Sequence, residues 1–268
     1  MGVNGKIWAL MIDLLLPIEK LHGVGSRNIS RLHKLGIKTV KDLLWHIPTR
    51  YEDYTQIVPI SKIEPGQKVN IQGEVMKIDS KRIFPRRLFI TNAIIKDESG
   101  AVKAVWFNQP FISNSLTEGT LVSLAGKINL DKHGLYLASP TYEKISAMYT
   151  SPQALTHTGR LVPTYPETEG VSSKYLRFLI KPLLKNLQIG DPLPKEMVQK
   201  HSLPTLQEAI KSIHFPKDLK ETESAKDRLA FDDLLLFQIR ALLERRKMNQ
   251  LKSVPIKFDK ELVADFIS

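Results

Sequence analysis

A run of short alternating segments between residues 69 and 145 is the feature that most restricts how this chain can fold. Apolar residues recur at every second position, so one side of each segment can face a core while the other faces solvent. The expected strands are Val69–Val75, Arg87–Lys96, Ala101–Phe107, Leu121–Asn129 and Leu135–Ile145, with turns at Asp97–Gly100 and Asp131–Gly134. Short strands separated by turn residues are typical of a small antiparallel barrel or sandwich.

The gap between Phe107 and Leu121 is long enough to hold a short helix. Five strands with a short helix after the third match the OB-fold, a small barrel that binds oligonucleotides. We therefore expect an α+β fold: a five-stranded OB-fold β-barrel flanked by an N-terminal helical, helix-hairpin-helix-like segment and a C-terminal helical region. The expected division is 1–54 for the N-terminal segment, 55–147 for the barrel, 148–223 for an extended and helical extension, and 224–268 for a linker helix.

Three helices are expected in the N-terminal segment. The spacing of apolar residues in Lys6–Leu16 predicts the first helix. Ser26 is the expected N-cap of the second, and Thr39 with Asp42 three residues later predicts a capping box for the third. Gly23 and Gly25, in the turn before Ser26, would leave backbone N–H groups open at a helix N-terminus, which suits a phosphate. A tight turn between packed helices is the alternative interpretation.

The C-terminal region is expected to begin with an extended segment, Leu161–Pro166, and to continue as helices. Ser172 or Ser173 can cap the first of these helices, which is expected to end near Leu187. The last is expected over Ala225–Lys247, with Arg228 outside its apolar stripe. The stripe comprises Leu229, Leu235, Leu236, Ile239, Leu242 and Leu243.

The net charge indicates the class of partner. Lys and Arg number 39 against 28 acidic residues, which gives a net charge of +11 and a pI near 9.6. An excess of this size favours a polyanionic partner, nucleic acid before membrane, although charge that serves only solubility is an alternative. The apolar run Ile7–Ile18 is interrupted by Asp13 and Pro17 and is too short to span a bilayer, so we expect a cytoplasmic protein with no membrane partner.

Cysteine is absent from the sequence, which excludes disulfides, thiolate metal sites and a catalytic cysteine. The seven histidines show none of the paired spacings that zinc sites use. We therefore expect no metal site and no catalytic residues in this chain.

Two aromatic residues near the end of the expected strand Ala101–Phe107 are candidates for base stacking. Lys103 marks the solvent side of this strand, and Phe107 shares that side because side chains alternate. Phe111 follows four residues later, beyond a proline. Burial of both rings in a barrel core is the alternative, since Phe is usually buried.

The expected loop between the first two barrel strands, Asp79–Arg87, is basic. It carries the cations Lys81, Arg82, Arg86 and Arg87, with Phe84 among them. In an OB-fold this loop contacts nucleic acid, so cations beside an aromatic favour phosphate and base contact over a merely solvated loop.

Several spaced motifs, in the same order, resemble the N-terminal part of the RecG DNA helicase family. The motifs are Leu21–Gly25, Asp42–Asp53, Trp106–Gln109, Val162–Gly170, Ile213–Pro216 and Arg228–Leu235. The resemblance implies a wedge domain that splits replication forks and four-way junctions ahead of an ATP-dependent motor, in recombination, repair and fork reversal. It also implies that Phe107 and Phe111 stack on bases where the arms part; a phenylalanine at the second position, in place of the family's tyrosine, loses a hydroxyl.

The family's motor motifs are missing from this sequence. The nearest match to a phosphate-binding loop, Gly119–Lys127, has six residues between its glycines instead of four, and Ile128 stands where a magnesium-binding hydroxyl is needed. ATP and magnesium are therefore expected only for a motor outside this chain, and the chain alone is expected to be inactive as an ATPase. We interpret it as a natural truncation or a cut piece that ends before the motor.

The expected function is branched-DNA binding by a monomer, with single-strand DNA-binding protein as a second candidate partner. One alternative is an autonomous OB-fold protein that binds single-stranded DNA. Another is an OB module whose basic groove binds acidic peptides.

Overall fold

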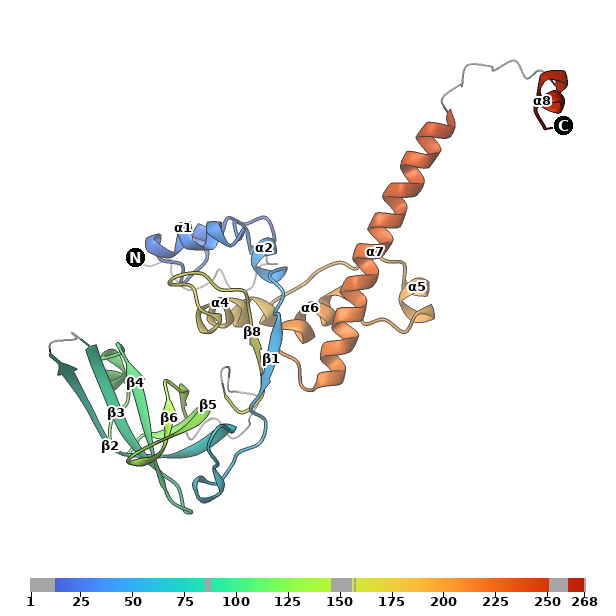
Figure 1. Cartoon of the computed structure of the whole chain (residues 1–268). Coiled ribbons are helices and arrows are strands. Elements are labelled where there is room, and N and C mark those ends of the chain that lie inside the picture. Colours follow the sequence, from blue (N-terminus) through green and yellow to red (C-terminus); the bar gives the residue numbers. More distant parts are fainter. Residues whose placement is uncertain (1–12, 85–87, 146–155, 157, 251–259, 268) are drawn as a thin grey trace, which may run out of the picture.

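The computed structural model describes residues 13–84, 88–145, 156, 158–250 and 260–267. Figure 1 shows three parts: a β-barrel, a helical body beside it, and a long helix, α7, that leaves the body. No helix among the described residues is both long and apolar enough to cross a bilayer.

The barrel contains six strands, connected in the order β2-β3-β4-β6-β5-β7 and closed by pairing between β2 and β5. The strands are β2 (Lys68–Ile83), β3 (Leu88–Lys96), β4 (Ala101–Phe107), β5 (Leu121–Asp131), β6 (Gly134–Ala138) and β7 (Thr141–Lys144), with α3 (Phe111–Ser115) between β4 and β5. The pairs are antiparallel except β4 with β6, which is parallel. This arrangement confirms the OB-fold prediction.

The last expected strand is divided in two. The strand is interrupted between β6 and β7 by Ser139 and Pro140. Ser139 has a φ of 45°, and the Pro140 carbonyl accepts a hydrogen bond of 2.8 Å from the Trp106 indole. Proline has no N–H to continue a ladder, so one predicted strand becomes two.

The first barrel strand is more than twice as long as predicted, because it serves two partners. Its first half pairs with β5 and its second half with β3, with a register shift between Val75 and Lys77. Such a bulge bends a strand and allows it to close a barrel. Just before the bulge, a Cβ added at Gly73 would lie 2.5 Å from the Lys96 carbonyl oxygen, so only glycine permits this approach.

The barrel core confirms the predicted alternation of β4. Val102, Ala104 and Trp106 are buried in the core, while Lys103 is exposed on the opposite face; Val105, which the alternation also placed on the solvent face, is buried. The core is completed by side chains such as Ile71, Val75, Ile95, Ile112, Leu124 and Leu137.

The helical body combines two segments that are far apart in sequence. Its helices are η2 (Ile18–Lys20), α1 (Ser26–Lys34), α2 (Val40–Leu44), α4 (Ser173–Lys185), α5 (Lys195–Lys200) and α6 (Leu206–His214). One hydrophobic cluster contains residues from both segments, among them Leu32, Leu43, Leu176 and Ile210. A two-stranded sheet, β1 (Arg50–Asp53) with β8 (Leu161–Thr164), also joins the segments.

Most of the expected helix boundaries in the body are confirmed. Thr39 and Asp42 form the predicted capping box of α2, and Ser172 caps α4. Ser26 is the first residue of α1, whose N-cap is Gly25, so its prediction as the cap was wrong by one position. Of the expected helix Lys6–Leu16, residues 13–16 form a turn, and the others lie outside the described residues.

The apolar stripe predicted for the last helix is confirmed only at its start, where Leu229 packs against the body. In α7 (Leu219–Gln250), Leu236, Ile239, Leu242 and Leu243 are exposed, whereas Arg228, which the prediction left outside the stripe, is fully buried. Only the first part of α7 packs on α6, and the rest extends away from the body (Figure 1). A further short helix, α8 (Lys260–Ile267), follows it.

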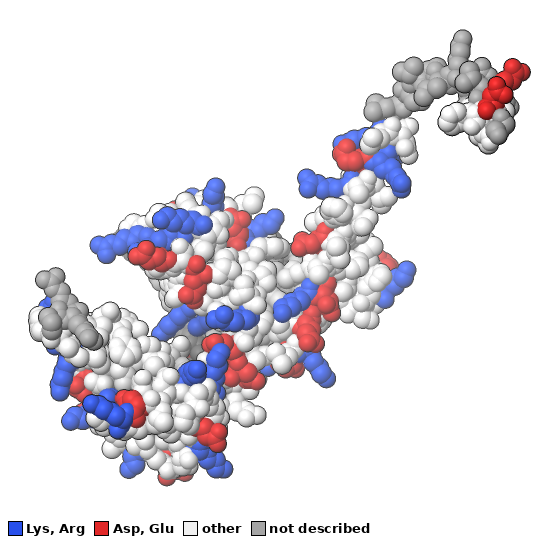
Figure 2. All heavy atoms as spheres, in the orientation of Figure 1, with Lys and Arg blue, Asp and Glu red and all other residues white. Residues whose placement is uncertain are grey.

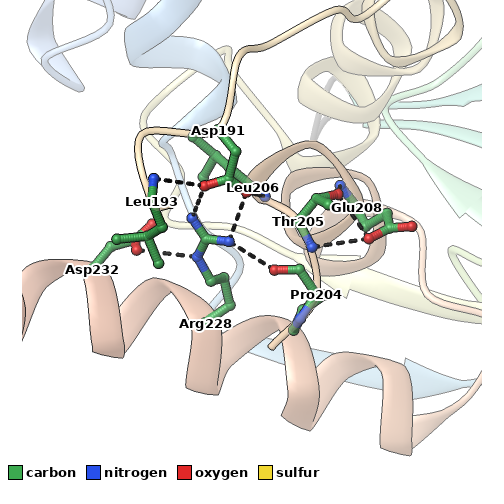
Figure 3. Close-up of polar contacts among 8 residues, drawn as sticks. All are labelled: Asp191, Leu193, Pro204, Thr205, Leu206, Glu208, Arg228 and Asp232. Atoms are coloured by element: carbon green, nitrogen blue, oxygen red, sulfur yellow. Dashed lines mark hydrogen bonds and ion pairs between the residues drawn. The ribbon is translucent and has the colours of Figure 1, made fainter. Parts of the chain in front are cut away.

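Arg228 is buried because a polar network surrounds it (Figure 3). Its guanidinium forms two hydrogen bonds to the Asp191 carboxylate, at 2.7 and 2.9 Å, and one of 3.0 Å to Asp232. A further N–H donates to the Pro204 carbonyl at 2.8 Å. The network ties α7 to the chain on both sides of α5.

Candidate nucleic-acid interface

The outer face of the barrel sheet β2–β3–β4 brings together residues from three strands. In the strand register, Lys81 lies opposite Ile90, and Ile90 lies opposite Phe107. In the same way Lys77 lies opposite Ile94, and Ile94 opposite Lys103. Because side chains of one strand alternate, these residues share the face that points away from the core.

A basic groove lies on this outer face. The groove is an open depression of about 650 Å³ between the sheet, η3 (Ile60–Lys62) and the β5–β6 turn. Its lining includes Lys77, Lys81, Lys103, Asn92, Ile94 and His133, and one carboxylate, Asp79. Three lysines beside exposed apolar side chains suit a ligand that carries both phosphates and flat bases.

Phe107 and Phe111 are not core residues. The side chain of Phe107 is 41% exposed and that of Phe111, the first residue of α3, is 56% exposed. The turn between them is held to the β3 strand: the Asn108 N–H donates to the Phe89 carbonyl at 2.8 Å, and the Thr91 hydroxyl donates to the Gln109 carbonyl at 3.1 Å. The sheet therefore fixes the backbone on which Phe107 is presented.

The predicted basic loop Asp79–Arg87 is largely strand. Residues 79–83 belong to β2, and Arg86 and Arg87 lie outside the described residues. Because side chains alternate along a strand, Lys81 points to the outer face of the sheet and Arg82 points to the opposite face. Arg82 lies 4.8 Å from the ring centre of the exposed Phe84 and 5.5 Å from that of Phe89, so cation–π contacts hold it on that second face.

The predicted phosphate turn lies apart from the barrel, on the helical body. Gly23 has a φ of 91°, and its carbonyl accepts a hydrogen bond of 2.9 Å from the Tyr175 hydroxyl. Gly25 is the N-cap of α1, and because glycine has no side chain, no side chain caps the helix there. The structure thus groups Lys81, Lys103 and Phe107 on one face and leaves Gly23 and Gly25 on another part of the protein.

Three groove residues were missed by the sequence analysis: Lys77, Asn92 and His133. Lys77 and Asn92 lie on the same face of the sheet as Lys103. The strand register reveals this, whereas the sequence alone does not. His133 reaches the groove from the β5–β6 turn, and only barrel closure brings that turn beside the sheet.

Cations are not confined to this groove. Figure 2 shows Lys and Arg side chains on the barrel, on the helical body and on the outer end of α7. Among the described residues, no group of three His, Asp or Glu side chains is placed to hold a metal ion.

Comparison with known proteins gives one consistent result. A family model described as the RecG wedge domain matches residues 17–187. The ATP-dependent DNA helicase RecG of Thermotoga maritima is 30% identical over 96% of this chain and 32% of its own length, and that of Staphylococcus epidermidis is 28% identical over 96% of this chain and 36% of its own. The chain therefore spans about a third of the length of these relatives.

A solved structure agrees in fold. The structure of RecG bound to a three-way DNA junction matches 96% of this chain and 35% of that protein, with a TM-score of 0.74 and 27% identity.

Proposed function

Because this chain belongs to the RecG wedge domain family, we propose that it binds branched DNA, replication forks and four-way junctions, as the wedge region of a RecG-type helicase. The observation that carries the proposal is the outer face of the barrel, where the basic groove leads along one sheet to the exposed ring of Phe107. The solved relative with the same fold was bound to a three-way junction. In this proposal ATP hydrolysis and unwinding belong to the part of the relatives that this chain does not match.

The proposed mechanism is steric and electrostatic. The lysines of the groove hold the phosphates of one strand, and Phe107 stacks on the last base before the arms part. A duplex drawn against this ring would then be opened by the barrel. Autonomous binding of unbranched single strands is the second candidate, favoured by the mixed basic and apolar lining of the groove.

A competition experiment at several salt concentrations tests the proposal. If about five phosphates are neutralised, the logarithm of the binding constant for a fork should fall against the logarithm of salt concentration with a slope of roughly −3.5 to −4.5. Lys81→Ala and Lys103→Ala should each flatten that slope by about one unit, and Lys195→Ala on α5 should not. Equal affinity for forks and unbranched single strands would favour the second candidate, and no affinity for either would reject both.

Phe107→Ala should weaken fork binding by ~1–3 kcal/mol, because it removes a base–aromatic stack. The thermal midpoint should change little, since the ring is already partly in solvent. Fork affinity and melting are to be measured on the same sample, with Phe107→Trp as the variant that keeps an aromatic face and should keep binding. A stability loss of ~3–5 kcal/mol would instead identify Phe107 as a packing residue.

A further inference from the structure

One side of α4 carries a stripe of three lysines and one aromatic ring, of which Lys174, Phe178 and Lys185 are exposed and Lys181 is half-buried. Lys174, Phe178, Lys181 and Lys185 are spaced at i, i+4, i+7 and i+11, which places them on one side of the helix. The opposite side, including Leu176, Leu179, Ile180 and Leu183, is buried in the body. At 1.5 Å per residue the stripe is about 16 Å long.

The aromatic ring in this stripe is held in place although it is exposed. Phe178 is 51% exposed, and its ring centre lies 6.4 Å from that of Tyr175 with an angle of 22° between the planes. A Cβ added at Gly23 would lie 2.7 Å from Phe178 Cε1, so the glycine turn packs directly against the ring. The Tyr175 hydroxyl, bonded to the Gly23 carbonyl, joins ring and turn. Phe178 is therefore a fixed flat surface open to solvent.

Positive charge exceeds negative charge along α4. α4 contains no acidic residue, and the nearby carboxylate Glu143, from β7 of the barrel, interacts with Arg160, Lys174, Arg177 and Lys181 together. Glu143 also accepts hydrogen bonds from the backbone N–H groups of Thr156 and Thr158. Glu143 is thus the carboxylate that all four of these cations share.

The other acids near these cations have partners of their own. Glu52 pairs with Lys68 at 2.9 Å, Glu221 pairs with Lys217 at 3.2 Å, and Glu167 accepts a hydrogen bond from the Ser173 N–H. Partial burial where α4 meets the barrel lowers the pKa of Lys174 and of Lys181, while Glu143 acts in the opposite direction. A polyanion would be attracted to this surface, because lysines outnumber carboxylates along α4.

We propose that this side of α4 is a second DNA contact surface, which binds an unpaired arm of the branched substrate through phosphates on its lysines and a base on Phe178. A single strand fits better than a duplex, because a base can stack on an exposed ring only when it is unpaired. The surface adjoins the barrel, since Lys174 Nζ lies 4.5 Å from the ring centre of Tyr142 on β7. The inference rests on the proposed function and extends the path of the strand from the barrel to the helical body.

Fork binding by the full chain tests this inference, with forks that carry either a long or a very short single-stranded arm. Phe178→Ala should weaken binding to the long-arm fork by roughly 5- to 150-fold, which is the range for one lost stack. Lys185→Glu should weaken it as well and flatten the salt dependence by about one unit or more. Neither change should affect the short-arm fork, whose arm ends before α4.

Controls separate this inference from the proposed function. Phe178→Trp should keep binding, and Phe237→Ala and Lys200→Glu, at exposed positions on α7 and α5, should have no effect. If barrel variants such as Lys103→Ala weaken fork binding while Lys185→Glu and Phe178→Ala do not, the inference is overturned and the proposed function stands. If Phe178→Ala fails to fold, Lys185→Glu still tests the inference, because it changes an exposed charge and not the packing of α4. If the unaltered chain binds no branched DNA, both fail.

Discussion

Arg228→Ala should lower the free energy of unfolding by roughly 3–5 kcal/mol, because it removes one side of a buried ion pair and leaves the other without its charge partner. Arg228 is fully buried and bonds to Asp191, Asp232 and the Pro204 carbonyl (Figure 3). Hydrogen bonds from Arg228 lower the pKa of Asp191 to about 2, so the pair is ionised throughout the neutral range. Asp191 would retain the N–H groups of Leu193 and Leu206 as donors, which favours the lower end of this range.

Denaturant unfolding measures this loss directly. The matched control is Lys247→Ala, which removes an ion pair of α7 with Glu244 in which both side chains are about two-thirds exposed. Lys247→Ala should alter the free energy of unfolding by no more than about 0.5 kcal/mol, since exposed ion pairs contribute little to stability. Similar small values for both variants would contradict the role assigned to the network.

As the pH falls from 6.5 to 4, the titration of His214 should lower the free energy of unfolding by roughly 3 kcal/mol. Burial lowers the pKa of His214 from 6.5 to about 4 in the folded protein, so below pH 6.5 the unfolded chain binds a proton that the folded chain rejects. The stabilisation is therefore complete above pH 6.5 and is lost as the pH falls toward 4. The buried imidazole lies 2.8 Å from the Leu44 carbonyl through Nε2 and 2.9 Å from the Tyr165 hydroxyl through Nδ1. Because a carbonyl only accepts, Nε2 carries the proton and Nδ1 accepts from the tyrosine.

The measurement is the free energy of unfolding across this pH range for the unaltered chain and for His214→Gln. The variant should be less stable at neutral pH, and its curve should be flatter by up to 1.4 kcal/mol per pH unit, because the titrating group is gone. Parallel curves for the unaltered chain and the His214 variant would refute the assignment.

Much of the barrel and part of its site could be predicted from local pattern. Alternation along Ala101–Phe107 correctly separated Trp106, in the core, from Lys103 and Phe107 on the outside. This works because the direction of a strand side chain depends only on its position in the strand. Lys77, Asn92 and His133 could not be found in the same way, because the bulge in β2, the strand register and barrel closure decide which residues meet in the groove.

What the sequence determined by itself is local: the alternating strands, the turns between them, the capping box of Thr39 and Asp42, and the net positive charge. Each depends on residues a few positions apart, or on composition, and so needs no knowledge of the fold. The tertiary structure alone decided that residues 18–44 and 165–210 share one core, that Arg228 is buried, and that the apolar residues in the second half of α7 are exposed. Burial depends on which distant element covers a side chain, and the apolar pattern of α7 gave no indication that its second half extends past the body. The same reason applies to α4, where Gly23 comes to lie against Phe178 only because two segments about 150 residues apart fold together.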